Sequence, residues 1–168
     1  MSKYFAGAAL GLALSFIFAG APAAAQHGDA AACRSGGGPT GSAILVNVSG
    51  FRERSGNLRV NVYGSDPSRF LARGRYIRQV NVPATGSGPV RVCVAVPGPG
   101  RYAVAVRHDH DSDGNDWQDG GGFSRNPRVS LLSLRPSYDN VAFNVGRGVA
   151  GVNITLLYRY GLSIRPAA

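Results

Sequence analysis

Carboxylates are concentrated in the stretch HDHDSDGNDWQDGGGFSRN, residues 108–126. The chain has only nine acidic residues, and five of them fall within eleven consecutive positions of this stretch. The order Asp109, Asp111, Asp113, Gly114 matches the first half of a calcium loop, in which alternate carboxylates converge on one hard cation while the glycine turns the chain. The sequence therefore predicts a divalent cation at this loop, with Ca²⁺ as the first candidate.

The second half of the loop departs from the calcium motif. Position 12 normally holds a glutamate that binds through both oxygens, and here it is Gly120. The predicted ligands are therefore Asp109, Asp111, Asp113, the backbone carbonyl of Asn115, and Asp116 or Asp119. Without the glutamate, we expect weak binding, with a Kd of about 10⁻⁴ to 10⁻³ M. The alternative is that these residues only form turns and that nearby arginines neutralise their charge.

The histidines of the same stretch allow a second interpretation, which is a metal-dependent hydrolase using His108, Asp109 and His110. Strand parity, however, places His108 on the core side at the end of a strand, where a histidine commonly holds a loop by hydrogen bonds. Ser124 lacks the G-x-S-x-G context of an exposed nucleophile and is expected to be a turn residue. Because the sequence contains no complete catalytic arrangement, we expect a non-enzymatic module and keep the hydrolase as an alternative.

The first 25 residues have the pattern of a signal peptide. Lys3 precedes an apolar run, and Ala23-Ala24-Ala25 provides a small-residue cleavage site after Ala25. The apolar run is shorter than the roughly 20 residues of a spanning helix, and no second run follows. We expect a periplasmic or secreted protein with no transmembrane segment in the mature chain.

Export also bears on the two cysteines, Cys33 and Cys93, which remain after cleavage. Thiol pairs tend to oxidise in such compartments, and no C-x-x-C motif suggests catalytic use. The sequence therefore predicts a structural Cys33–Cys93 disulfide.

Arginine dominates the charge of the mature chain. Cleavage removes the single lysine, so 17 arginines against nine acidic residues give a net charge of +8. A segment with Arg69, Arg73, Arg75 and Arg78 is the best candidate for contacts with anionic envelope polymers. Its spacing matches no nucleic-acid module, and we expect no nucleic-acid partner.

The pattern along the chain predicts the fold. Residues 26–41 have little to bury and are expected to form a flexible leader, whereas residues 42–168 are expected to form a single domain. Seven segments alternate between apolar and polar residues and are separated by Gly and Pro turns; they are AILVNVSGF, LRVNVYG, RYIRQVNVP, PVRVCVAVP, RYAVAVRHD, DNVAFNVG and GVNITLLYRY. This predicts an all-β sandwich of about seven strands, immunoglobulin-like or transthyretin-like. Residues 65–75 are the exception, and Asp66 followed by Pro67 predicts a short helical turn there.

Several motifs together resemble an exported bacterial family catalogued as domain of unknown function 2141. The resemblance covers roughly residues 42–160. The matching residues are His108, Asp109, Gly114, Gly120, Gly122, Phe123, Ser124, Pro136, Ser137, Asp139, Ala142 and Phe143. Departures are Asp111 and Asp113, where the family commonly has asparagine, and Asp119, where it has glutamate. The resemblance implies export and a β-sandwich, and it implies no particular activity.

Overall fold

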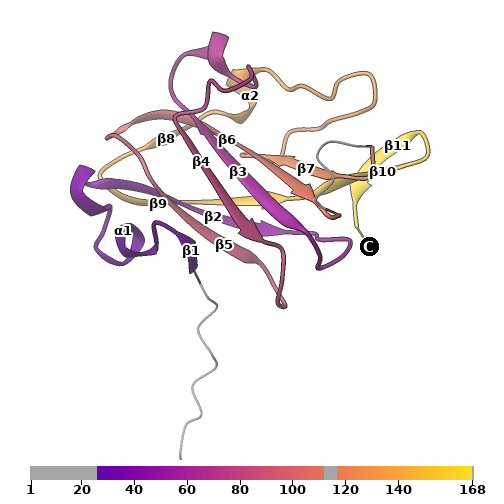
Figure 1. Ribbon diagram of the computed structural model, residues 1–168. Helices are drawn as coiled ribbons and strands as arrows, with labels where there is room; N and C mark the ends of the chain where they lie inside the picture. The colour runs from indigo at the N-terminus through magenta and orange to yellow at the C-terminus, as the bar shows by residue number, and fades with distance from the viewer. Residues whose placement is uncertain (1–25, 112–116, 168) are drawn as a thin grey trace, which may run out of the picture.

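The computed structural model describes residues 26–111 and 117–167 and shows a β-sandwich (Figure 1). The strands are β1 (Gln26–Gly28), β2 (Ser42–Ser49), β3 (Asn57–Tyr63), β4 (Arg78–Pro83), β5 (Val90–Ala95), β6 (Gly100–Asp109), β7 (Gly120–Phe123), β8 (Phe143–Val145), β9 (Gly148–Thr155), β10 (Leu157–Tyr160) and β11 (Ser163–Pro166). The helices are α1 (Ala30–Arg34) and α2 (Tyr138–Val141), and 3-10 turns lie at Gly38–Thr40 and Pro67–Arg69. The all-β sandwich predicted from the sequence is confirmed, with eleven strands in the described residues where seven alternating segments were recognised.

Two sheets form the layers of the sandwich. The smaller sheet has the order β1-β5-β2-β9, and the larger sheet has the order β11-β10-β7-β6-β3-β4, with β8 paired to the start of β6. Leu156 lies between β9 and β10, so the chain passes there from the smaller sheet to the larger one. β9 runs parallel to β2 along its whole length, which joins the beginning and the end of the domain.

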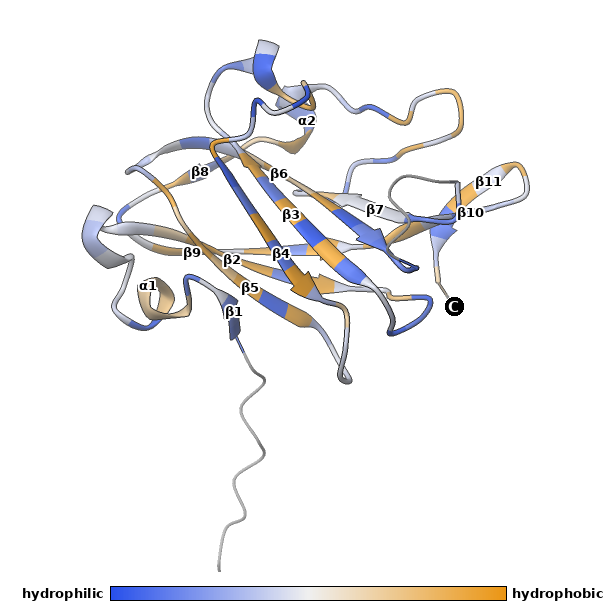
Figure 2. Ribbon diagram, in the orientation of Figure 1, coloured by the Kyte–Doolittle hydropathy of each residue, from blue (hydrophilic) through white to orange (hydrophobic). Residues whose placement is uncertain are grey.

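The main core lies between the two sheets and follows from the alternation of side chains along each strand (Figure 2). Ile44, Val92 and Ile154 enter it from the smaller sheet. Leu58 and Val106 enter it from the larger sheet, and all five side chains are buried. Burying one such side chain stabilises the fold by about 1.5 to 3 kcal/mol. The interface between the two sheets is therefore the main source of stability.

A second, smaller apolar cluster covers part of the outer face of the larger sheet. Tyr138 and Val141 of α2 pack there against Ala103 and Ala105 of β6. The segment between β3 and β4 adds Phe70, whose ring contacts Tyr138 edge-on at a centroid distance of 5.9 Å. The helical turn predicted in this segment is confirmed at Pro67–Arg69, where the side chain of Asp66 accepts a hydrogen bond from the Ser68 N–H.

The N-terminal segment corrects the prediction of a flexible leader at 26–41. β1 pairs in parallel with β5, and α1 packs against the same strand. The Cys33–Cys93 disulfide is present and holds α1 on the outer side of the smaller sheet, where Cys93 is fully buried. The low hydrophobicity of this segment suggested disorder, but strand pairing and the covalent bond order it.

The expected signal peptide, residues 1–25, lies outside the described residues. Within 26–111 and 117–167, no helix has the length and apolar character needed to cross a membrane.

Candidate functional site

The acidic stretch connects β6 to β7 in the larger sheet. β6 ends at Asp109 opposite Asn57 of β3, and β7 begins at Gly120 opposite His108 of β6. Two neighbouring strands therefore fix both ends of the connection, which we call the acidic loop, residues 110–119.

His108 anchors the first end of the acidic loop from inside the core, as its strand parity predicts. Its side chain is fully buried, its Nε2 lies 2.8 Å from the Ser55 carbonyl oxygen, and its Nδ1 lies 2.7 Å from the Tyr158 hydroxyl. A carbonyl can only accept, so Nε2 carries the proton and Nδ1 accepts from Tyr158. Burial lowers the pKa of His108 below its ordinary value, although the hydrogen bond to Ser55 acts in the opposite direction. With both ring nitrogens engaged, His108 is not available as the metal ligand of the hydrolase alternative.

The loop between β2 and β3 forms hydrogen bonds with both ends of the acidic loop. Ser55 donates its hydroxyl to the His110 carbonyl oxygen at 2.9 Å. Arg52 donates to the Gln118 carbonyl oxygen at 3.1 Å, and its guanidinium lies 5.0 Å from the centre of the Tyr158 ring. The acidic loop is therefore held at its first and its penultimate residue by one neighbouring loop.

Three residues of the acidic loop come together and form a candidate metal centre. One ligand atom each from His110, Asp111 and Asp119 lies within 4.8 Å of the other two. Nδ1 of His110 is 3.8 Å from Oδ1 of Asp119, and Nε2 is 3.7 Å from Oδ2 of Asp111. Of the predicted ligands, Asp113, Asn115 and Asp116 lie outside the described residues.

Asp109, the predicted first ligand, faces a different neighbour. It is the last residue of β6 and projects to the outer face, where its Oδ2 lies 4.0 Å from the Arg107 guanidinium. Arg107 binds Asp119 more closely and donates its Nε–H at 2.9 Å. Asp119 therefore belongs both to an ion pair and to the cluster with His110 and Asp111.

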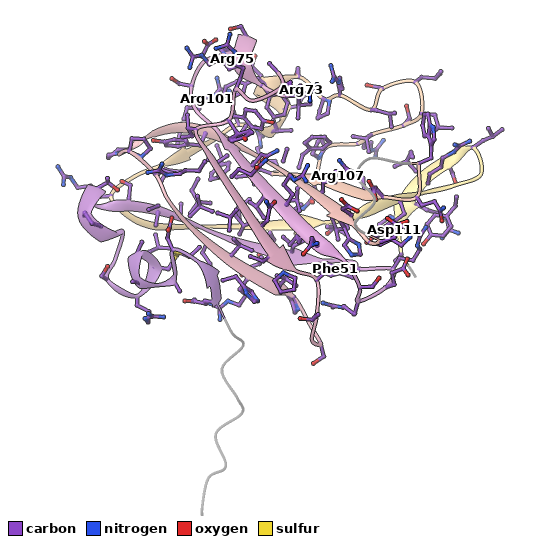
Figure 3. All side chains as sticks on the ribbon, viewed as in Figure 1. Phe51, Arg73, Arg75, Arg101, Arg107 and Asp111 are labelled. Carbon is purple, nitrogen blue, oxygen red and sulfur yellow. A yellow bond between two sulfur atoms is a disulfide. The ribbon has the colours of Figure 1, made fainter. Side chains whose placement is uncertain are left out.

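Arg107 and Asp111 lie near the same end of the larger sheet, and Arg73, Arg75 and Arg101 lie near the other end (Figure 3). Arg101 pairs there with Asp139 at 2.9 Å. The arginine-rich segment and the acidic loop therefore form separate features of the surface.

Ser124 is a structural residue, as the missing nucleophile context predicts. Its side chain is fully buried, its hydroxyl donates to the Val141 carbonyl oxygen at 2.6 Å, and its oxygen accepts from the Val104 N–H at 3.0 Å. These bonds attach α2 to β6.

A groove lies on the outer face of the larger sheet beside the acidic loop, and sequence patterns gave no indication of it. Its floor is the glycine strand β7, in which successive residues alternate between the two faces. An added Cβ at Gly120 or Gly122 would meet Tyr158 at 2.5 Å or Ile154 at 2.6 Å in the core. At Gly121 the nearest atom would be 3.9 Å away, so this position leaves open space in the groove. A run of glycines has no hydrophobic alternation, which is why neither β7 nor the groove was predicted.

The comparison with protein families follows the same elements. Residues 46–153 match the family model described as an uncharacterized protein conserved in bacteria, DUF2141. The chain belongs to this family. The DUF2141 match runs from within β2 to within β9 and therefore includes His108, the acidic loop and the glycine strand. No curated protein and no solved structure matches the chain.

Proposed function

We propose that this DUF2141 protein is an exported, non-enzymatic binding module of the bacterial envelope whose acidic loop holds a divalent cation at His110, Asp111 and Asp119. The observation that carries the proposal is the convergence of three ligand atoms within 4.8 Å. Export is supported by the signal-peptide pattern ahead of residue 26.

The charge balance around His110 supports a cation. Among the described residues, four carboxylates surround this end of the sheet, those of Glu53, Asp109, Asp111 and Asp119. Two arginines compensate part of this charge, since Arg52 lies 3.3 Å from Glu53 and Arg107 binds Asp119. In the part of the chain that the structure describes, these carboxylates outnumber the two arginines, and like charges at about 4 Å repel each other by about 1 kcal/mol in water and about 4 kcal/mol near a protein surface. A divalent ion would reduce this repulsion.

The identity of the ion depends on which atoms bind it. The D-x-D-x-D-G spacing and the carboxylates of Asp111 and Asp119 favour Ca²⁺, which prefers oxygen ligands. A second candidate, Zn²⁺, is favoured by His110, because its Nδ1 is buried and has no hydrogen-bond partner among the described residues. Both ions would join the two ends of the acidic loop.

Thermal unfolding of the mature protein, residues 26–168, tests the proposal. Melting curves are recorded with Ca²⁺, Mg²⁺, Zn²⁺ and chelator. At a hundredfold excess over the Kd, binding contributes about 2.7 kcal/mol. This corresponds to a rise in Tm of several degrees for a domain of this size.

Matched variants separate binding at the loop from general charge effects. Asp111→Asn should abolish the rise in Tm. Asp139→Asn is the control, because it removes an equal charge from a carboxylate that pairs with Arg101 at another part of the surface. This control should keep the rise in Tm. His110→Gln should remove a response to Zn²⁺ and retain one to Ca²⁺. Coinciding curves in metal and chelator, or a parent-like response in Asp111→Asn, would refute the cation site.

A further inference from the structure

The groove on the outer face of the larger sheet is open to solvent and has a volume of about 600 Å³, within the range of about 300 to 1000 Å³ typical of small-molecule sites. We propose that it binds a single-chain amphipathic carboxylate, with the apolar chain lying over Gly121 and the carboxylate at Arg159. The proposal rests on the groove and does not require the cation of the acidic loop.

The inner part of the groove is suited to an apolar chain. Its floor at Gly121 has no side chain, and its walls come from three separate segments of the protein. The apolar wall residues are Leu71, Phe123, Val129, Leu134, Leu157 and Ile164. A chain placed between these walls would be removed from water at about 25 cal/mol per Å² of apolar surface.

The two arginines that line the groove differ in whether a carboxylate pairs with them. Arg107 is neutralised by Asp119, with which it forms an ion pair, and it also approaches Asp109. Arg159 has no ion pair within residues 26–111 and 117–167, and its Nε–H is donated to the Gly161 carbonyl oxygen at 2.9 Å. Among the described residues, therefore, no carboxylate balances the charge of Arg159, and this favours a ligand whose ionic group is an anion bound at this residue.

Trp117 marks the same end of the groove. The Arg159 guanidinium lies 4.9 Å from the centre of its ring, and 66% of the Trp117 surface is exposed. Four of the six exposed large hydrophobic side chains of the described residues lie in segments that border the groove; they are Trp117, Leu132, Leu134 and Leu162. This apolar surface around an arginine suits a ligand with a long chain and a small anionic end better than a compact polar ion.

Trp117 is the only tryptophan of the chain, so its fluorescence reports on the groove directly. The mature protein is titrated in chelator with decanoate below its micelle concentration, and in parallel with decanol. We expect a saturable change in emission with decanoate and weaker binding of decanol, by up to about fivefold, because exposed ion pairs contribute no more than about 1 kcal/mol. Quenching by 2-bromodecanoate should exceed quenching by 10-bromodecanoate, because the carboxylate end lies beside Trp117. Equal binding of decanol, or stronger quenching by the 10-bromo chain, would overturn the proposal.

Two pairs of variants test the apolar and the ionic contacts separately. Gly121→Leu fills the floor and should weaken decanoate binding about tenfold or more. Gly151→Leu adds the same side chain in open space on the smaller sheet and should leave binding unchanged. Arg159→Gln should reduce decanoate binding to the level of decanol.

Arg165→Gln is the matched control for Arg159→Gln. Arg165 lies opposite the inward-facing Tyr158 in the β10–β11 hairpin, so its side chain is on the other face of this hairpin from Arg159. Parent-like binding in Gly121→Leu, or equal effects of the two arginine variants, would refute the assigned site. If Gly121→Leu does not fold, the arginine pair and the two bromo acids decide the question. Chelator is present in all of these titrations, so they test the groove without any bound cation. A negative result would refute ligand binding in the groove and would not bear on the cation site. A negative result for the cation site would likewise not bear on the groove.

Discussion

Replacement of His108 by phenylalanine tests how the core holds the acidic loop. Phenylalanine keeps approximately the size and shape of the imidazole, so the change removes hydrogen bonds and leaves little cavity. The Ser55 carbonyl oxygen and the Tyr158 hydroxyl each lose a partner at 2.8 and 2.7 Å. A buried polar group left unsatisfied costs about 1 to 3 kcal/mol. Because the Ser55 bond is only partly buried and water can replace it, we expect a total loss of about 2 to 4 kcal/mol.

The pH dependence of this loss follows from the lowered pKa of His108. Above about pH 6.5, the ordinary pKa of histidine, neither the folded nor the unfolded state binds a proton at this residue. Below that pH the unfolded chain binds a proton that folded His108 does not, so His108 lowers the stability of the parent as the pH falls. The slope is at most about 1.4 kcal/mol per pH unit. His108→Phe lacks this contribution, and the stability difference between the two proteins should therefore shrink as the pH falls below 6.5.

Urea unfolding at several pH values between 5 and 8 measures this difference in the free energy of unfolding. Tyr158→Phe and the double variant complete a double-mutant cycle, and the two substitutions should be less than additive because they remove the same hydrogen bond. A stability difference that stays constant from pH 8 to pH 5, or strict additivity in the cycle, would contradict the assigned role of His108.

Three further predictions concern the sheets. Gly122→Ala should destabilise the fold by about 1 to 3 kcal/mol, because its Cβ would press on Ile154, whereas Gly121→Ala should change stability by less than about 0.5 kcal/mol; equal effects on Tm would contradict the assigned faces. The Cys33→Ala/Cys93→Ala double variant should lose up to about 4 kcal/mol in urea unfolding, because the bond closes a loop of 60 residues, and an unchanged midpoint would contradict this. Ser124→Ala should lower the free energy of unfolding by about 1 to 3 kcal/mol, and a Tm equal to that of the parent would show that its buried hydrogen bonds do not contribute.

Much of the sandwich could be predicted because each of its long strands has one consistently apolar face. In β2, β3, β5 and β6 every second residue is a large apolar side chain over three repeats, and this period places each side chain on a face. The same parity placed His108 in the core and Cys93 on the outer side of its sheet. The family resemblance was also confirmed over residues 46–153.

Other elements had no such pattern. β1 has three residues and is ordered by pairing with β5 and by the nearby disulfide, which are long-range effects that local composition does not contain. β7 consists of glycines and one phenylalanine, and its strand conformation comes from its neighbours β6 and β10. β11 pairs only with β10 and is largely exposed, so it shows no clear burial period.

The sequence predicted a candidate metal site in this loop, but it identified only some of the residues that form it. Counting along the loop as a calcium motif selected Asp111 and Asp119, and both are in the described cluster. It did not select His110, whose approach to the carboxylates depends on how the chain turns after β6 ends. Spacing alone also could not show that Arg107 pairs with Asp119, because this contact joins β6 to the far end of the loop.

Equilibrium dialysis of the mature protein against Ca²⁺ and Zn²⁺ tests the cation site most directly, because it counts bound ions without relying on stability. We expect saturation at about one ion per chain in the parent and in Asp139→Asn, with a Kd for Ca²⁺ of about 10⁻⁴ to 10⁻³ M. We expect Asp111→Asn to lose this ion. If neither ion binds the parent up to millimolar concentrations, or if Asp111→Asn binds as many ions as the parent, the cluster of His110, Asp111 and Asp119 is an ion-pair network and not a metal site.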